Sequence, residues 1–192
     1  MMISALLLAV TTLRPLSGAQ FTADTACLKQ YKGEAELRER KWSPLDSVTF
    51  KVGGKPVKIC YSRPSARGRT MLGGVNPYGW LWRTGANEPT ILFTPITLSL
   101  AGLQVPPGAY SLYSLPGEKE WSIIVNCSTR HWGNTLNEST TAHEVGRTKV
   151  KRKRIAQHIE TFTIRPDPAA SNAKAIVLEW EHTRVRIPVA PG

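Results

Sequence analysis

Apolar and polar residues alternate along much of the chain from residue 46 onward. In the first such stretch, Val48, Phe50 and Val52 alternate with polar residues, and a second stretch follows directly after Gly53-Gly54. Alternation with a period of two puts the apolar side chains on one face of a strand, and paired glycines supply the positive φ angles of a tight turn. The pattern therefore predicts a β-hairpin at the start of the folded region.

Further alternating stretches recur, separated by turns that contain Gly and Pro. They predict strands over residues 90–100, 110–115, 121–127, 148–154, 159–165, 175–180 and 184–189. The sequence lacks the long helical patterns between strands that a parallel α/β fold requires. About nine short strands with turns between them are typical of an antiparallel β-sandwich. We therefore predict one all-β sandwich domain over residues 46–190.

The first 45 residues do not follow this pattern. Residues 3–13 form an apolar run that is too short to span a bilayer, and small residues at Ser17 and Ala19 suit cleavage by a signal peptidase. We predict a signal peptide over residues 1–19 and hence an exported protein, periplasmic or extracellular; a buried amino-terminal strand or helix is the alternative. Residues 20–45 form a polar lead-in segment, with one short helix predicted within residues 27–41.

The stretch from residue 62 to residue 89 has no sustained alternation and is rich in Gly, Arg and Pro. Loops of this length in a compact domain are uncommon and often carry function. Arginines offer planar donors to a carboxylate, phosphate or sulfate, and tryptophans offer flat surfaces for stacking. The candidate ligand-binding residues of this loop are Arg63, Arg69, Trp82, Arg83, Asn87 and Glu88. In the structural alternative, the arginines bond the loop's own carbonyl groups and the tryptophans fill the end of the sandwich.

The loop favours a non-enzymatic module that binds a small anionic or sugar-like ligand. The alternative from another class is a hydrolase or lyase in which Glu88 acts as acid or base with His131 or Tyr61, while Arg83 stabilises developing negative charge. A third hypothesis is a structural partner-binding domain with a broad apolar patch. The sequence contains no HExxH or CxxC motif, no GxSxG elbow and no phosphate-binding glycine loop, so we predict no metal and no cofactor.

Positive charge is in excess, since 25 Lys and Arg face 14 Asp and Glu for a formal net charge of +11. Six of these cations lie between Arg147 and Arg154. We predict that this run lies along a solvated strand edge, where lysines discourage pairing with other chains. Contact with an anionic envelope surface is the alternative. Because we expect export, we do not expect a nucleic-acid partner.

The three cysteines, Cys27, Cys60 and Cys127, cannot all pair within one chain. Export would allow a disulfide to form and persist. Since Cys60 and Cys127 both fall in or beside predicted strands, we predict that any bridge joins these two; free thiols are the alternative.

Several short motifs, taken in order, resemble a known family. They lie at residues 60–69, 77–79, 82–88 (WRTGANE), 107–112, 116–118, 120–121, 132–133 and 178–185. Together they resemble the bacterial family known as domain of unknown function 2911, over about residues 43–189. The resemblance implies an exported bacterial protein. It implies no activity, because the family has no established one.

Overall fold

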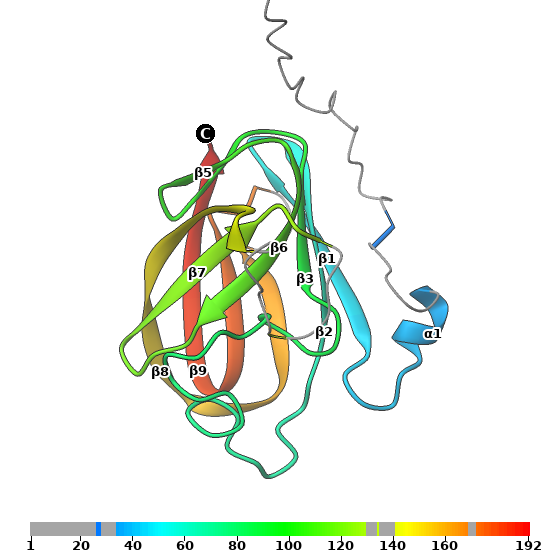
Figure 1. Cartoon of the computed structure of the whole chain (residues 1–192), viewed down its shortest axis with the longest axis vertical. Coiled ribbons are helices and arrows are strands. Elements are labelled where there is room, and N and C mark those ends of the chain that lie inside the picture. Colours follow the sequence, from blue (N-terminus) through cyan, green and yellow to red (C-terminus); the bar gives the residue numbers. More distant parts are fainter. Residues whose placement is uncertain (1–25, 28–33, 130–133, 135–140, 169–171) are drawn as a thin grey trace, which may run out of the picture.

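A computed structural model of the chain describes residues 26–27, 34–129, 134, 141–168 and 172–192. The predicted signal peptide and His131 lie outside these residues. Strands account for nearly all of the regular structure, and α1 (Glu34–Arg38) is a single short helix beside them (Figure 1). No helix in the described part of the chain has the length and apolar character needed to cross a membrane.

One antiparallel sheet contains all of the strands. They are β1 (Leu45–Val52), β2 (Lys55–Ser62), β3 (Thr90–Thr94), β4 (Leu98–Leu100), β5 (Leu103–Val105), β6 (Gly108–Leu115), β7 (Glu120–Asn126), β8 (Glu144–Asp167) and β9 (Ala175–Pro191). Their order in the sheet is β1-β2-β3-β6-β7-β8-β9-β4-β5, and the sheet is not closed into a barrel. The predicted antiparallel all-β fold of about nine strands is confirmed.

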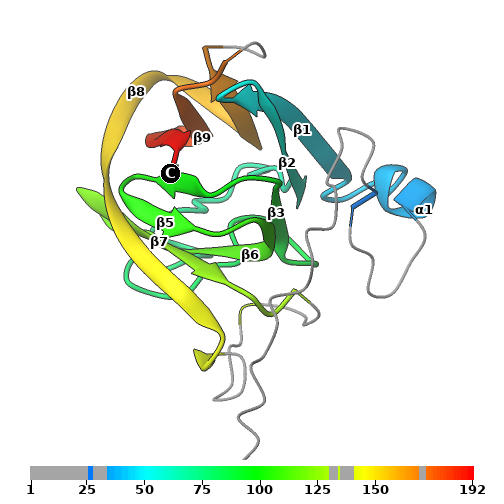
Figure 2. The same ribbon diagram turned by 90° about the horizontal axis from the view of Figure 1, so that it is seen from above.

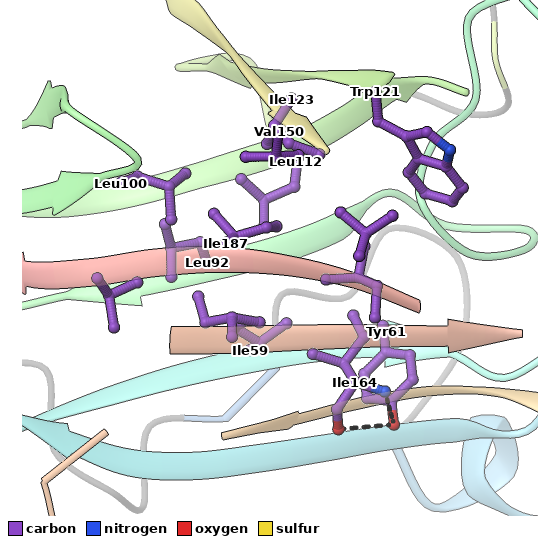
Figure 3. Close-up of a cluster of buried hydrophobic side chains, with 14 of the residues drawn as sticks. Ile59, Tyr61, Leu92, Leu100, Leu112, Trp121, Ile123, Val150, Ile164 and Ile187 are labelled. Carbon is purple, nitrogen blue, oxygen red and sulfur yellow. Dashed lines mark hydrogen bonds between the residues drawn. The ribbon is translucent and has the colours of Figure 1, made fainter. Parts of the chain in front are cut away.

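The sheet folds over so that its two halves share one core, as the layers of a sandwich do. A single buried cluster contains Leu92, Leu112 and Ile123 from the half formed by β1, β2, β3, β6 and β7, and Ile164 and Ile187 from β8 and β9 (Figure 3). Seen from above, β8 arches around one side of the molecule (Figure 2). Each buried side chain of this size stabilises the fold by about 1.5–3 kcal/mol relative to the exposed state, so the shared core holds the halves together.

The predicted hairpin between β1 and β2 is confirmed. Gly53 and Gly54 form its two-residue turn, with φ angles of 55° and 77°, and Val52 lies opposite Lys55. Two positive φ angles in succession match the twist of the flanking strands and are easily adopted only by residues such as glycine.

Strand boundaries differ from the prediction where the chain changes direction. The strand predicted over residues 90–100 is two strands, because β3 pairs with β2 whereas β4 pairs with β9 in the other half of the sheet. The last four predicted strands are joined pairwise into β8 and β9, and β5 was not predicted. The helix expected within residues 27–41 is described only at α1. Within the basic run, residues 147–151 pair with β7 and residues 152–154 pair with β9, so each part has a neighbouring strand on one side only among the described strands.

Strands β8 and β9 form a nested pair. β9 folds back at Glu181, whose φ is 49°, so that the backbone N–H of Val189 donates to the carbonyl of Lys174 at 2.9 Å. Residues 152–154 of β8 pair with residues 183–185 of β9, beyond the bend, and residues 159–167 of β8 pair with residues 175–181, before it. β8 therefore runs around the outside of the bend, as Figure 1 shows at the lower end of the two strands.

A disulfide attaches the lead-in segment to the outer side of the sheet. Cys27 is bonded to Cys60 of β2, with the two Cα atoms 5.8 Å apart. Leu37 of α1 is buried in a second, smaller cluster beside this bridge, together with Ile91 and Phe93 of β3. The bridge and this cluster hold the end of the lead-in segment against β1, β2 and β3.

The predicted bridge between Cys60 and Cys127 is wrong. Cys60 lies on β2 and Cys127 directly follows β7, and β3 and β6 separate these two strands in the sheet. Three inter-strand spacings amount to about 14 Å, and a disulfide tolerates Cα atoms no more than about 7 Å apart. Cys127 is a free, exposed thiol.

Candidate functional site

The loop predicted over residues 62–89 connects β2 to β3 and crosses the lower end of the molecule in Figure 1. It contains no strand. Isolated bridges join Ser65 to Thr161 of β8 and Trp82 to Ser114 of β6. The loop is therefore fixed to both halves of the sheet and closes this end of the core.

Trp82 of the loop is a core residue, with 2% of its surface exposed. Its ring stacks on Trp180 with 5.6 Å between centroids and meets Trp121 and Phe162 edge-on. Its indole N–H donates to the carbonyl of Gly85 at 2.8 Å. Trp82 therefore fills the end of the core, as the structural alternative expects, because packed aromatic neighbours cover its ring.

Arg69 and Arg83 bond to carbonyl groups of the loop itself. Arg69 donates from Nε to Ala66 at 3.0 Å and from Nη2 to Ser65 at 3.1 Å. Arg83 donates from Nη1 to the carbonyl of Asn87 at 2.8 Å. Burial lowers the pKa of Arg83, and its buried Nε has no hydrogen-bond partner among the described residues. Arg69 and Arg83 therefore satisfy backbone carbonyl groups of their own loop, as the structural alternative expects.

Glu88 is buried and belongs to an ion pair. Arg40 of the lead-in segment donates two hydrogen bonds to its carboxylate, at 2.8 and 3.1 Å, and the Ser62 hydroxyl donates a third at 3.2 Å. Burial raises the pKa of Glu88, but the hydrogen bonds from Arg40 and Ser62 outweigh it, so that its pKa lies below the ordinary value of 4.5. Glu88 is therefore ionised at neutral pH and anchors the lead-in segment.

We expect the substitution Arg40→Gln to lower the free energy of unfolding at neutral pH by about 2 kcal/mol, less than for a fully buried pair because Arg40 is partly exposed. The folded-state pKa of Glu88 is below 4.5, so the pair stabilises the fold fully above that pH and loses its effect as the pH falls through the folded pKa. The difference between wild type and variant, measured by urea unfolding, therefore shrinks below pH 4.5.

Lys149→Gln is the matched control for this prediction, since it breaks an exposed pair with Glu120 that we expect to contribute less than about 1 kcal/mol. Equal losses in the two variants, or a difference that grows in acid, would contradict the assignment.

Tyr61, the expected partner of Glu88 in acid–base chemistry, points into the core (Figure 3). Its hydroxyl accepts from the backbone N–H of Ile164 at 3.0 Å and donates to the carbonyl of the same residue at 3.4 Å. Burial raises the pKa of Tyr61 to about 12. Tyr61 is thus protonated at neutral pH and bonded to the β8 backbone, whereas Glu88 is bonded to Arg40 and Ser62.

A groove of about 400 Å³ opens where the lead-in segment, the start of the loop and β8 meet. Its lining includes Lys41 and Trp42 from the lead-in segment, Arg63 and Arg67 from the loop, and Glu160 from β8. Of the six predicted binding residues, Arg63 alone contributes to this groove. Three cations, one carboxylate and one aromatic ring thus face a common space.

Trp42 carries two cations against its ring and is 54% exposed. The Arg67 guanidinium lies 4.1 Å from the ring centroid, and the Lys41 ammonium lies 4.9 Å from it. Glu160 accepts a hydrogen bond from the backbone N–H of Arg67, at 2.7 Å. Within the described part of the chain, the side chains of Arg67 and Lys41 have no acidic partner.

Arg63 forms a fixed wall of the groove. Its Nη1 lies 3.1 Å from the carboxylate of Asp46, and its Nε donates to the carbonyl of Phe162 at 3.4 Å. Its backbone N–H donates to Pro44 at 2.9 Å. Arg63 therefore joins the lead-in segment, β1 and β8, and Asp46 compensates its charge.

Comparison with known families gives one match. The model of the family described as "Protein of unknown function (DUF2911)" matches residues 43–189. The chain belongs to this family. The comparisons with curated proteins and with solved structures found no match.

The DUF2911 region contains the loop, Arg63, Arg67 and Glu160, whereas Lys41 and Trp42 directly precede it. The sequence pattern did not single out these two residues, because the lead-in segment reads as a polar connection. The sequence does carry one signal for this site, a cation next to a tryptophan and followed by Ser43-Pro44. Among the residues that the structure describes, no group of three or more His, Cys, Asp or Glu side chains is placed to hold a metal ion.

Proposed function

We propose that this DUF2911 protein is a non-enzymatic binding module that takes a small anionic ligand, such as an acidic sugar, in the groove beside Trp42. The observation that carries the proposal is the pair of cations, Arg67 and Lys41, placed against an exposed aromatic ring without an acidic partner in the described structure. The volume of about 400 Å³ is in the range of small-molecule sites.

The position of Arg67 over the Trp42 ring, 4.1 Å from its centroid, prepares the guanidinium for an anion. A guanidinium that lies flat on a ring loses little further freedom on binding, and the N–H groups at its edge stay directed outward. Such a group forms paired, charge-assisted hydrogen bonds with a carboxylate, phosphate or sulfate. The exposed part of Trp42 offers an apolar surface to the carbon skeleton of the same ligand.

The Cys27–Cys60 disulfide supports the further proposal that the protein is exported to the periplasm or the extracellular space. Disulfides persist in oxidising compartments and are rare in the reducing cytosol. A module that binds small anions outside the cytosol agrees with both the bridge and the groove.

Calorimetric titration with galacturonate, citrate and inorganic phosphate, at an ionic strength held constant with sodium chloride, tests the groove. We expect at least one probe to bind wild type, and Arg67→Gln to weaken its binding about tenfold or more, because one charge-assisted interaction contributes about 1.5–3 kcal/mol. Arg67→Lys keeps the charge but not the planar stack, so its affinity is expected to lie between the two.

Lys55→Gln, at the start of β2, makes the same change of net charge away from the groove and is expected to bind like wild type. No binding of any of the three probes to wild type, or equal weakening in Lys55→Gln and Arg67→Gln, would overturn the proposed function.

A further inference from the structure

The outer face of the nested β8–β9 pair carries a block of cations. Lys149, Lys151 and Lys153 alternate along β8, and Arg184 and Arg186 alternate along β9. Their neighbours Val150, Val185 and Ile187 belong to the core, so these five side chains point away from it. Residues two apart on a strand are separated by about 6.7 Å and adjacent strands by about 4.8 Å, so the cations form two parallel rows.

Negative charge compensates only part of this block. Lys149 pairs with Glu120 at 3.1 Å, and Arg186 pairs with Asp167 at 3.0 Å. Arg184 is bonded to Glu179, whose carboxylate Arg165 also binds. The side chains of Lys151 and Lys153 have no acidic partner in the part of the chain that the structure describes.

The register places like charges opposite one another. Lys153 pairs directly across the ladder with Arg184, and such like-charged pairs destabilise a sheet. Protection of an open strand edge accounts for the lysines only in part: among the described strands, Lys149 and Lys151 pair with β7 alone and Lys153 pairs with β9 alone, but edge protection does not require cations opposite one another across a ladder. An anionic partner would relieve the repulsion that the fold tolerates here.

Two hollows adjoin on this face and share lining residues. One, of about 390 Å³, is lined in part by Lys149, Lys151 and Arg186. The other, of about 210 Å³, is lined in part by Lys151, Lys153, Arg184 and Arg186. Because Lys151 and Arg186 border both, the two hollows lie next to each other along the rows of cations, and we refer to them together as the depression.

We propose that this depression binds a linear acidic polysaccharide, whose successive anionic groups lie along the rows of β8 and β9. The shape favours an extended chain over a single small anion. The lining contains no aromatic side chain on which nucleic-acid bases would stack. The exposed large apolar residues of the described structure, Trp42, Val75 and Trp80, line neither hollow, so no side chain is placed there for insertion into a bilayer.

The experiment compares the full chain with a double variant, Lys151→Gln with Lys153→Gln, in binding to heparin and to polygalacturonate over a series of salt concentrations. We expect at least one polysaccharide to bind wild type and the double variant to bind it about tenfold or more weakly. The logarithm of the binding constant should also fall less steeply with the logarithm of salt, by about one to two units of slope, because fewer counterions are released.

Lys51→Gln with Lys55→Gln is the matched control, since both lysines are exposed on the β1–β2 hairpin and the net charge changes equally. We expect its affinity to stay within about twofold of wild type, as only long-range charge is altered. The variant Arg67→Gln should bind the polysaccharide like wild type, because the groove beside Trp42 shares no residue with the depression.

Three results would overturn the proposal. The first is no binding of either polysaccharide. The second is equal weakening in the two double variants, which would show that net charge alone determines affinity. The third is tighter binding of an oligothymidylate or of phosphatidylglycerol vesicles at the same salt concentration, which would assign the face to a nucleic acid or a membrane.

Discussion

Replacing Trp82 with alanine is expected to lower the free energy of unfolding by about 3–5 kcal/mol. The indole is 2% exposed and lies among Trp121, Phe162 and Trp180, so its removal leaves a large cavity where the loop closes the core. It also removes the hydrogen bond to the carbonyl of Gly85. Urea unfolding should show a lower midpoint with little change in the slope.

Trp80→Ala is the matched control, two residues away in the same loop. Trp80 is 70% exposed, and we expect its removal to change the free energy of unfolding by no more than about 0.5 kcal/mol. A small loss at Trp82, or equal losses at the two positions, would show that the ring of Trp82 is not part of the core.

Removing the Cys27–Cys60 bridge by Cys27→Ala with Cys60→Ala should destabilise the protein by about 3–4 kcal/mol. The bridge closes a loop of 33 residues, and its loss gives the unfolded chain more freedom. Thermal or urea unfolding of the oxidised wild type and the double variant measures the difference. Adding a reductant to wild type should lower its stability toward that of the variant.

The third cysteine gives the control for this experiment. Cys127 is free and exposed, so Cys127→Ala should leave the stability within about 0.5 kcal/mol of wild type and leave the effect of reductant unchanged. If reductant had no effect on wild type, or if Cys127→Ala abolished that effect, the pairing of Cys27 with Cys60 would be contradicted.

Local pattern was sufficient to predict most of the strands but not their partners. Alternation and the Gly53-Gly54 pair locate the first hairpin, and the loss of alternation at residue 62 marks the start of the long loop. Pairing of β4 with β9 depends on packing between residues far apart in the chain, for which one sequence carries no local signal. The disulfide was mispredicted for the same reason, because the order of strands between Cys60 and Cys127 decides which thiols can meet.

The sequence predicted the chemistry of the candidate site but not which residues form it. Arginine and tryptophan in the loop indicate anion binding and stacking, but the same residue types also serve the core and the backbone. Trp80 and Trp82 illustrate this, because the loop has no period that distinguishes an exposed ring from a buried one. Lys41 and Trp42 join the groove only through tertiary contacts of the lead-in segment, which the sequence pattern does not reveal.

The pairing of β4 with β9 has a consequence for the kinetics of folding. The hairpins β1–β2 and β6–β7 form between neighbouring residues, so they are available early as the chain is synthesised. Residues 98–100 cannot pair until residues 189–191 have been synthesised, and these are made last among the described strands. Contacts of such long sequence separation slow folding, so the second half of the sheet is completed only after residue 191 has been made.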